Sequence, residues 1–215
     1  CGSGPMLRMG APHIPREEIN WLKETLASTH KDQPVVFVNH FPQFEEIANS
    51  YEVTNILKKY NVQYILCGHF HVNSTKEYNG LTSVLGRSLL RRTDPIGGYN
   101  IVTLTADSMY VAERTIKGET HPVWFRGGLQ EQYVQKGDEI EISYAINEEY
   151  PQVKEAWRIS EVSDIASQAS IEGNFYVYTT TGGKTVALDA SAGEKIWEFQ
   201  SGNKIFSAPF ITDKM

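Results

Sequence analysis

The sequence predicts an α/β domain followed by an all-β region, on the strength of two patterns in its 215 residues. Early in the chain, short apolar runs alternate with stretches whose apolar residues recur at helical spacing, which is typical of parallel strands joined by helices. Late in the chain, residues repeat 40 positions apart, as Trp157 and Trp197 do. A period near 40 with short strands is in the range of propeller blades. We therefore expect an α/β region over 1–118, a β-rich junction over 119–152 and an incomplete propeller repeat over 153–215.

Composition excludes several classes of protein. The net charge of −6 argues against a nucleic-acid partner, and no apolar run approaches the roughly 20 residues of a membrane span. The two cysteines, Cys1 and Cys67, do not predict a disulfide framework. The start at Cys1 without a methionine, and the abrupt end, lead us to expect a fragment. A processed lipoprotein cysteine is the alternative explanation of the start.

The first helix is predicted over residues 15–28. Pro15 suits the first helical position, where the missing N–H costs nothing. Ile19, Leu22 and Leu26 then recur at helical spacing, so this helix should bury one face.

A βαβ unit is predicted next. Residues 35–38 and 62–67 are short, bounded apolar runs rich in β-branched side chains, so each should be a buried strand. Apolar residues recur at helical spacing over 53–60 between them. The two strands should then be parallel, with a right-handed crossover.

Three histidines follow the ends of these two strands. His40 comes just after the first strand, and His69 and His71 come after Gly68 at the end of the second. If 69–71 stays extended, His69 and His71 point to the same side. Parallel strands end at the same edge of a sheet, so we expect all three imidazoles to converge there. Such a cluster can bind a metal ion, and a hydrogen-bonded polar loop is the alternative.

Two motifs carry a resemblance to a known family. Val38-Asn39-His40-Phe41-Pro42 and Gly68-His69-Phe70-His71 are similar to the last two metal-binding motifs of the calcineurin-like metallophosphoesterases, and the resemblance covers about residues 10–118. It implies a phosphate ester substrate and two divalent transition metal ions in the complete parent, with Zn, Mn, Fe and Ni all left open. It further implies that His40 and His69 bind one ion and His71 the other.

The same comparison shows what is missing. The family's earlier Asp-x-His, Gly-Asp and Gly-Asn-His motifs, which supply the remaining ligands, do not occur before Val38, and His13 is no substitute. Three histidines without a bridging carboxylate leave two dications uncompensated. We therefore expect at most one bound ion and no activity from this chain alone, unless the missing ligands come from another segment or chain.

The region after the histidines should be β-structured. Asn79-Gly80 predicts a tight hairpin, and strands are expected over 81–85, 99–104, 109–114 and 139–144. Arg87 and Arg91, with Arg92, are candidates for binding the substrate phosphate, and a solvated loop is the alternative.

The last third resembles the repeat of quinoprotein-alcohol-dehydrogenase-like (PQQ-like) propellers. The runs Asn174–Tyr178, Thr185–Asp189 and Lys195–Trp197 carry it, with Ala-Leu-Asp, Gly and Trp in order. The aromatic residue should pack between blades. A propeller needs about 4–8 blades, so an open blade favours self-association through its edges. The resemblance also suggests an extracytoplasmic location and a protein partner.

Three functions follow from these patterns. The first is a metal-dependent phosphoesterase that lacks part of its site. The second is a non-enzymatic binding or scaffold protein that uses a propeller. A quinone-dependent dehydrogenase ranks last, because the repeat is mostly architectural and the sequence has neither a vicinal cysteine pair nor a constellation of carboxylates for a quinone with its calcium.

Overall fold

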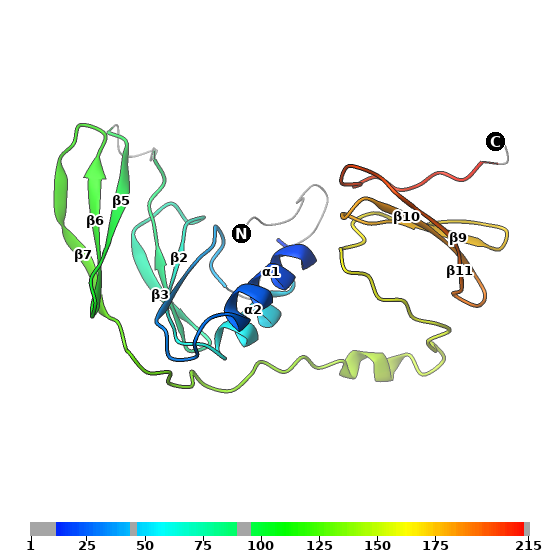
Figure 1. Ribbon diagram of the computed structural model, residues 1–215, viewed down its shortest axis with the longest axis horizontal. Coiled ribbons are helices and arrows are strands. Elements are labelled where there is room, and N and C mark those ends of the chain that lie inside the picture. Colours follow the sequence, from blue (N-terminus) through cyan, green and yellow to red (C-terminus); the bar gives the residue numbers. More distant parts are fainter. Residues whose placement is uncertain (1–11, 44–46, 90–95, 213–215) are drawn as a thin grey trace. The chain divides into compact units, whose positions relative to one another are not determined.

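A computed structural model describes residues 12–43, 47–89 and 96–212 (Figure 1). The chain forms two compact units, one of Cys1–Ile14 and Glu18–Glu141, the other of Pro15–Glu17 and Ile142–Met215. In the described residues, no helix has the length and apolar character needed to cross a membrane. The architecture is a mixed α/β sheet followed by antiparallel sheets, as the sequence predicted.

The first sheet contains the predicted βαβ unit. Its strand order is β1-β2-β4-β3, with β1 parallel to β2 and β2 parallel to β4. β3 and β4 form an antiparallel hairpin at Asn79 and Gly80, both with positive φ. The elements are α1 (Arg16–Ala27), β1 (Val35–Val38), α2 (Ser50–Leu57), β2 (Val62–Cys67), β3 (Ser74–Tyr78) and β4 (Leu81–Leu85).

Both faces of this sheet are covered, which explains why β1 and β2 read as continuous apolar runs. On one face, Ile19, Leu22 and Leu57 of the helices join the main core with strand residues such as Ile65. On the other face lies a second sheet, as Figure 1 shows, and a smaller core around Met109 joins the two. The second sheet has the order β5-β6-β7, made of β5 (Gly98–Leu104), β6 (Ser108–Thr115) and β7 (Thr120–Gly128).

β7 lies in the segment that the sequence analysis treated as a junction. It pairs antiparallel with β6, with register shifts on either side of Ala112. Such irregularities disturb the alternation of buried and exposed side chains, and Pro122 and Gly127-Gly128 look like turn signals. This explains why the strand was not recognised.

The predicted strand over 139–144 is wrong. No strand is found there, and η1 (Ala145–Glu149) follows it. The Ile140 N–H donates to Asn55 Oδ1 at 2.8 Å, and Asn55 Nδ2 donates to the Ile140 carbonyl at 2.9 Å. The Asn55 side chain on α2 therefore bonds to the backbone N–H and carbonyl of Ile140, which in the predicted strand would have bonded to a neighbouring strand.

The second unit contains one four-stranded antiparallel sheet with the order β11-β10-β9-β8. Its strands are β8 (Ser170–Glu172), β9 (Phe175–Thr179), β10 (Lys184–Asp189) and β11 (Lys195–Gln200). Trp157 packs on this sheet, where its Nε1–H donates to the Ala190 carbonyl at 3.1 Å and its ring meets Tyr176 edge-on. The turn beneath it needs Gly193, since a Cβ there would lie 2.6 Å from the indole.

Candidate metal centre

His40 and His69 are brought together by the parallel pairing of β1 and β2. Hydrogen bonds continue past the strand ends, from the Asn39 N–H to the Leu66 carbonyl at 3.0 Å and from the Gly68 N–H to the His40 carbonyl at 2.9 Å. The two imidazole centroids lie 5.7 Å apart at an interplanar angle of 83°. The two histidines thus meet at the carboxyl edge of the sheet.

Phe41 supports this pair. Its buried ring lies 4.2 Å from the His69 ring and 5.1 Å from the His40 ring, centroid to centroid. A ring packed against both imidazoles restricts their rotation and excludes water from one side of the pair.

The loop after Gly68 is not extended, contrary to the expectation that side chains alternate there. His69 and His71 have φ of 68° and 61°, in the left-handed region, and Gly68 is not among the residues with positive φ. A non-glycine residue in this region costs on the order of 1–3 kcal/mol and persists only where the surroundings hold it. The Phe70 N–H donates to the Gly68 carbonyl at 2.8 Å, which closes a tight turn within the loop.

The surroundings of His69 lower its pKa and so favour the neutral imidazole. Burial lowers its pKa first, and the nearby His40 and His71 lower it further, because a positive charge on His69 would be repelled by theirs. A neutral imidazole keeps the lone pair that a metal ion needs. The electrostatic effect of both neighbours also indicates that the three histidines share one neighbourhood.

The residues present fit part of a metal centre. Two imidazoles at this spacing leave room for one ion, because a zinc–nitrogen bond spans about 2.0–2.1 Å. Within the described ranges, however, no group of three or more His, Cys, Asp and Glu is arranged to hold a metal ion. The donors described here therefore suit one ion through an imidazole pair, and they do not fit a dinuclear centre with a bridging carboxylate.

Arg87, predicted as a phosphate ligand, is buried between the two sheets of the first unit. Its side chain has no exposed surface (0%), and its Nη1 forms an ion pair with Glu113 Oε1 on β6. Its Nε also donates to the Ser88 carbonyl at 3.0 Å. These contacts favour a structural role for Arg87. Arg91 lies outside the described residues, so its part in substrate binding stays a prediction.

Asn73 is a residue of this region that the sequence analysis missed. It lies two positions after His71, and its side chain bonds to Glu113, to Asn100 and to the Arg87 backbone. Polar residues in a loop give no sign of such long-range partners, which become visible only in the structure, where Asn100 of β5 and Glu113 of β6 lie next to Asn73.

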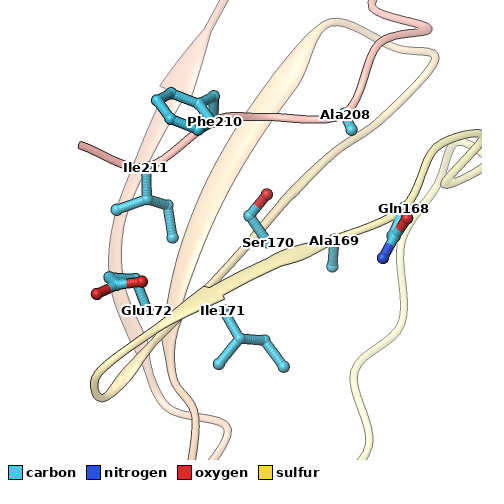
Figure 2. Close-up of a pocket in the computed structure, with 8 residues that line it drawn as sticks. All are labelled: Gln168, Ala169, Ser170, Ile171, Glu172, Ala208, Phe210 and Ile211. Atoms are coloured by element: carbon cyan, nitrogen blue, oxygen red, sulfur yellow. The ribbon is translucent and has the colours of Figure 1, made fainter.

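The second unit has an open pocket of about 330 Å³ between β8 and residues 208–211. Figure 2 shows Ser170 and Ile171 of β8 pointing to opposite sides of the strand, with Phe210 and Ile211 on the later segment. Of the residues that line it, Glu172 is the one with an ionisable side chain. The pocket therefore holds no acid–base pair or metal-ligand set.

Comparison with known proteins supports the class of the first region. Residues 7–73 match the family model of the calcineurin-like phosphoesterases, which is less than half of the chain. No curated protein matches the sequence. The family match covers both histidine motifs.

Three solved structures resemble parts of the chain. A conserved uncharacterized protein from Streptococcus pneumoniae TIGR4, named as a predicted phosphoesterase, is 19% identical with a TM-score of 0.28, over 38% of this chain and 48% of its own. A single mutant of Vps29 from Entamoeba histolytica is 17% identical with a TM-score of 0.27, over 41% and 52%. A europium-containing methanol dehydrogenase is 11% identical with a TM-score of 0.22, over 54% and 17%. The chain thus spans about half of the first two and a small part of the third, and matches with such TM-scores carry no functional argument.

Proposed function

We propose that the first unit provides the histidine-bearing part of a metal-dependent phosphoesterase site. The observation that carries the proposal is the His40–His69 pair, 5.7 Å apart at the carboxyl edge of two parallel strands, within a segment that matches the calcineurin-like phosphoesterases. His40 and His69 would bind one divalent ion in this chain, and His71 would contribute to a second ion only where another segment or chain supplies the remaining ligands.

Each residue of the site has a separate task in this proposal. The imidazoles of His40 and His69 supply neutral nitrogen donors, and Phe41 holds both rings in place. A divalent ion held there would supply Lewis-acid stabilisation to the phosphoryl oxygens of a phosphate ester. Because no carboxylate joins the histidines in the described residues, we expect hydrolysis only when another segment or chain supplies the remaining ligands.

The test is Zn²⁺ binding and turnover by the full chain. Calorimetric titration should show one bound ion, and replacing either His40 or His69 by alanine should weaken binding at least tenfold, because only one imidazole of the pair remains. His121→Ala, an exposed histidine on β7, is the matched control and should leave binding unchanged. Absence of binding by the unmodified chain would contradict the proposal.

The turnover assay addresses the missing carboxylates. A generic aryl phosphodiester should not be hydrolysed by this chain with Zn²⁺, Mn²⁺, Fe²⁺ or Ni²⁺. Hydrolysis that disappears in the His40 and His69 variants would show that the histidines suffice, and our account of the missing ligands would be wrong.

A second candidate function is a binding module built on the second unit, for which we propose a propeller-blade architecture and an extracytoplasmic location. Its support is the four-stranded meander with exposed apolar side chains on its edge strands, including Trp197 and Phe199 on β11 and Ile171 on β8. Such edges favour association. Analytical ultracentrifugation should then show concentration-dependent self-association that Phe199→Lys weakens, and a monomer at all concentrations would count against it.

A further inference from the structure

The loop that carries His69 and His71 ends at Asn73, whose side-chain amide is bonded to three other segments. Asn73 Oδ1 accepts the Arg87 backbone N–H at 3.0 Å and Asn100 Nδ2 at 2.8 Å. Asn73 Nδ2 donates to Glu113 Oε2 at 2.7 Å. Both ends of one amide are therefore used, which fixes its position and its orientation.

The partners of Asn73 are themselves fixed. Glu113 on β6 pairs with the buried Arg87 guanidinium, and its own side chain is 14% exposed. Asn100 Oδ1 accepts the Trp124 Nε1–H from β7 at 3.3 Å. The amide is thus anchored to a frame that spans both sheets of the first unit, and a charged, buried pair does not rearrange easily.

We propose that Asn73 is a positioning residue for the histidine loop. At the start of the loop, the Gly68 N–H bonds to the His40 carbonyl, and at its end Asn73 bonds to the frame. Between these anchors lie two non-glycine residues in the left-handed region, a backbone state that persists only when the surroundings impose it. Asn73 supplies that constraint and so sets where the rings of His69 and His71 lie relative to His40.

This inference deepens the proposed function, since it rests on that function for any effect on metal affinity. The geometry of the loop is independent of metal. The test therefore needs one measurement on the metal-free chain and one with Zn²⁺, so that the two ideas can fail separately.

The experiment compares Asn73→Ala with Asn55→Ala in the full chain. Asn55 is the matched control, because its amide also makes long-range hydrogen bonds within the first unit but contacts Ile140, away from the histidines. In the metal-free chain, NMR backbone couplings should show that His69 and His71 lose their positive φ in Asn73→Ala, and ring-to-ring nuclear Overhauser effects should show a weaker His40–His69 contact. Both observables should stay unchanged in Asn55→Ala. Asn73→Ala should bind Zn²⁺ about 10-fold or more weakly than the unmodified chain. Asn55→Ala should bind Zn²⁺ with little change in affinity, although its melting temperature falls by a similar amount.

Three outcomes are decisive. Unchanged loop couplings and ring contacts in folded Asn73→Ala overturn the positioning role. Altered couplings with no Zn²⁺ binding even in the unmodified chain support the positioning role and reject the metal site. If Asn73→Ala does not fold, Asn100→Ala removes one of the amide's three bonds and leaves the Arg87–Glu113 pair intact, and it should loosen the loop in the same direction. A loop unaffected in Asn100→Ala then overturns the proposal.

Discussion

Replacing Gly193 by alanine should destabilise the second unit strongly, for two separable reasons. Gly193 has φ +69, and a left-handed residue with a Cβ costs roughly 1–2 kcal/mol. The new Cβ would also lie 2.6 Å from Trp157 Cγ and 2.7 Å from Cδ2, so the indole must move. Overpacking of this kind costs about 1–3 kcal/mol, and displacement of the ring threatens its 3.1 Å hydrogen bond to Ala190. We expect a total of roughly 2–5 kcal/mol.

Gly173→Ala separates these two contributions. Gly173 lies between β8 and β9 with φ +57, and a Cβ there would meet nothing within 4 Å. Its replacement should therefore cost only the backbone term of roughly 1–2 kcal/mol. Hydrogen exchange of peptides covering β9 and β10 in the full chain measures the opening of this unit by itself. A loss in Gly193→Ala no larger than in Gly173→Ala would refute the packing argument.

Two further predictions concern the first unit. Burial raises the pKa of the Cys67 thiol from the ordinary value of 9.0 to about 12. Between these two pH values the thiol is therefore protonated in the folded chain and ionised in the unfolded chain. The corresponding stability is complete below about pH 9 and is lost as the pH rises towards 12, and Cys67→Val should remove this dependence from denaturation curves; an identical pH profile in the variant would contradict it. Arg87→Met should cost about 3–5 kcal/mol in the free energy of unfolding, because it leaves the Glu113 carboxylate without its counter-charge. Adding Glu113→Gln should restore part of that loss in urea denaturation, since Gln removes the charge and keeps an acceptor for Asn73, and no recovery would show that the pair is not the cause.

The candidate site lies where the ends of β1 and β2 meet, and two kinds of contact position its histidines. The parallel pairing of β1 and β2 brings the backbone of His40 next to that of Gly68, so His69 begins its loop beside His40. The loop that carries His69 and His71 then depends on tertiary contacts through Asn73. Perturbing the sheet should therefore affect the meeting of the two strand ends, and perturbing the frame around Glu113 should displace the rings of His69 and His71.

The sequence by itself determined the βαβ unit of the first sheet and the parallel pairing of its two strands. Apolar runs and helical spacing predicted α1, β1, α2 and β2 to within a few residues. Burial of one or both faces of an element requires apolar residues at regular spacing, and this spacing is visible in the sequence. Parallel pairing followed from the connection between the strands, so the meeting of His40 and His69 at one edge was predictable.

Tertiary structure alone decided three things. Residues 120–128 form β7 despite an irregular pattern of side chains, because they pair with the edge of β6. Residues 139–144 form no strand, because the Asn55 side chain bonds to the Ile140 backbone instead. Arg87 became part of the interior because Glu113 on β6 faces it. The backbone of His69 and His71 turned left-handed where alternation predicted an extended segment. The partner of β7 is the strand just before it, but the partners of Ile140, Arg87 and the histidine loop lie far away in the chain. Local periodicity shows which face a residue buries, and it does not show which group the residue meets there.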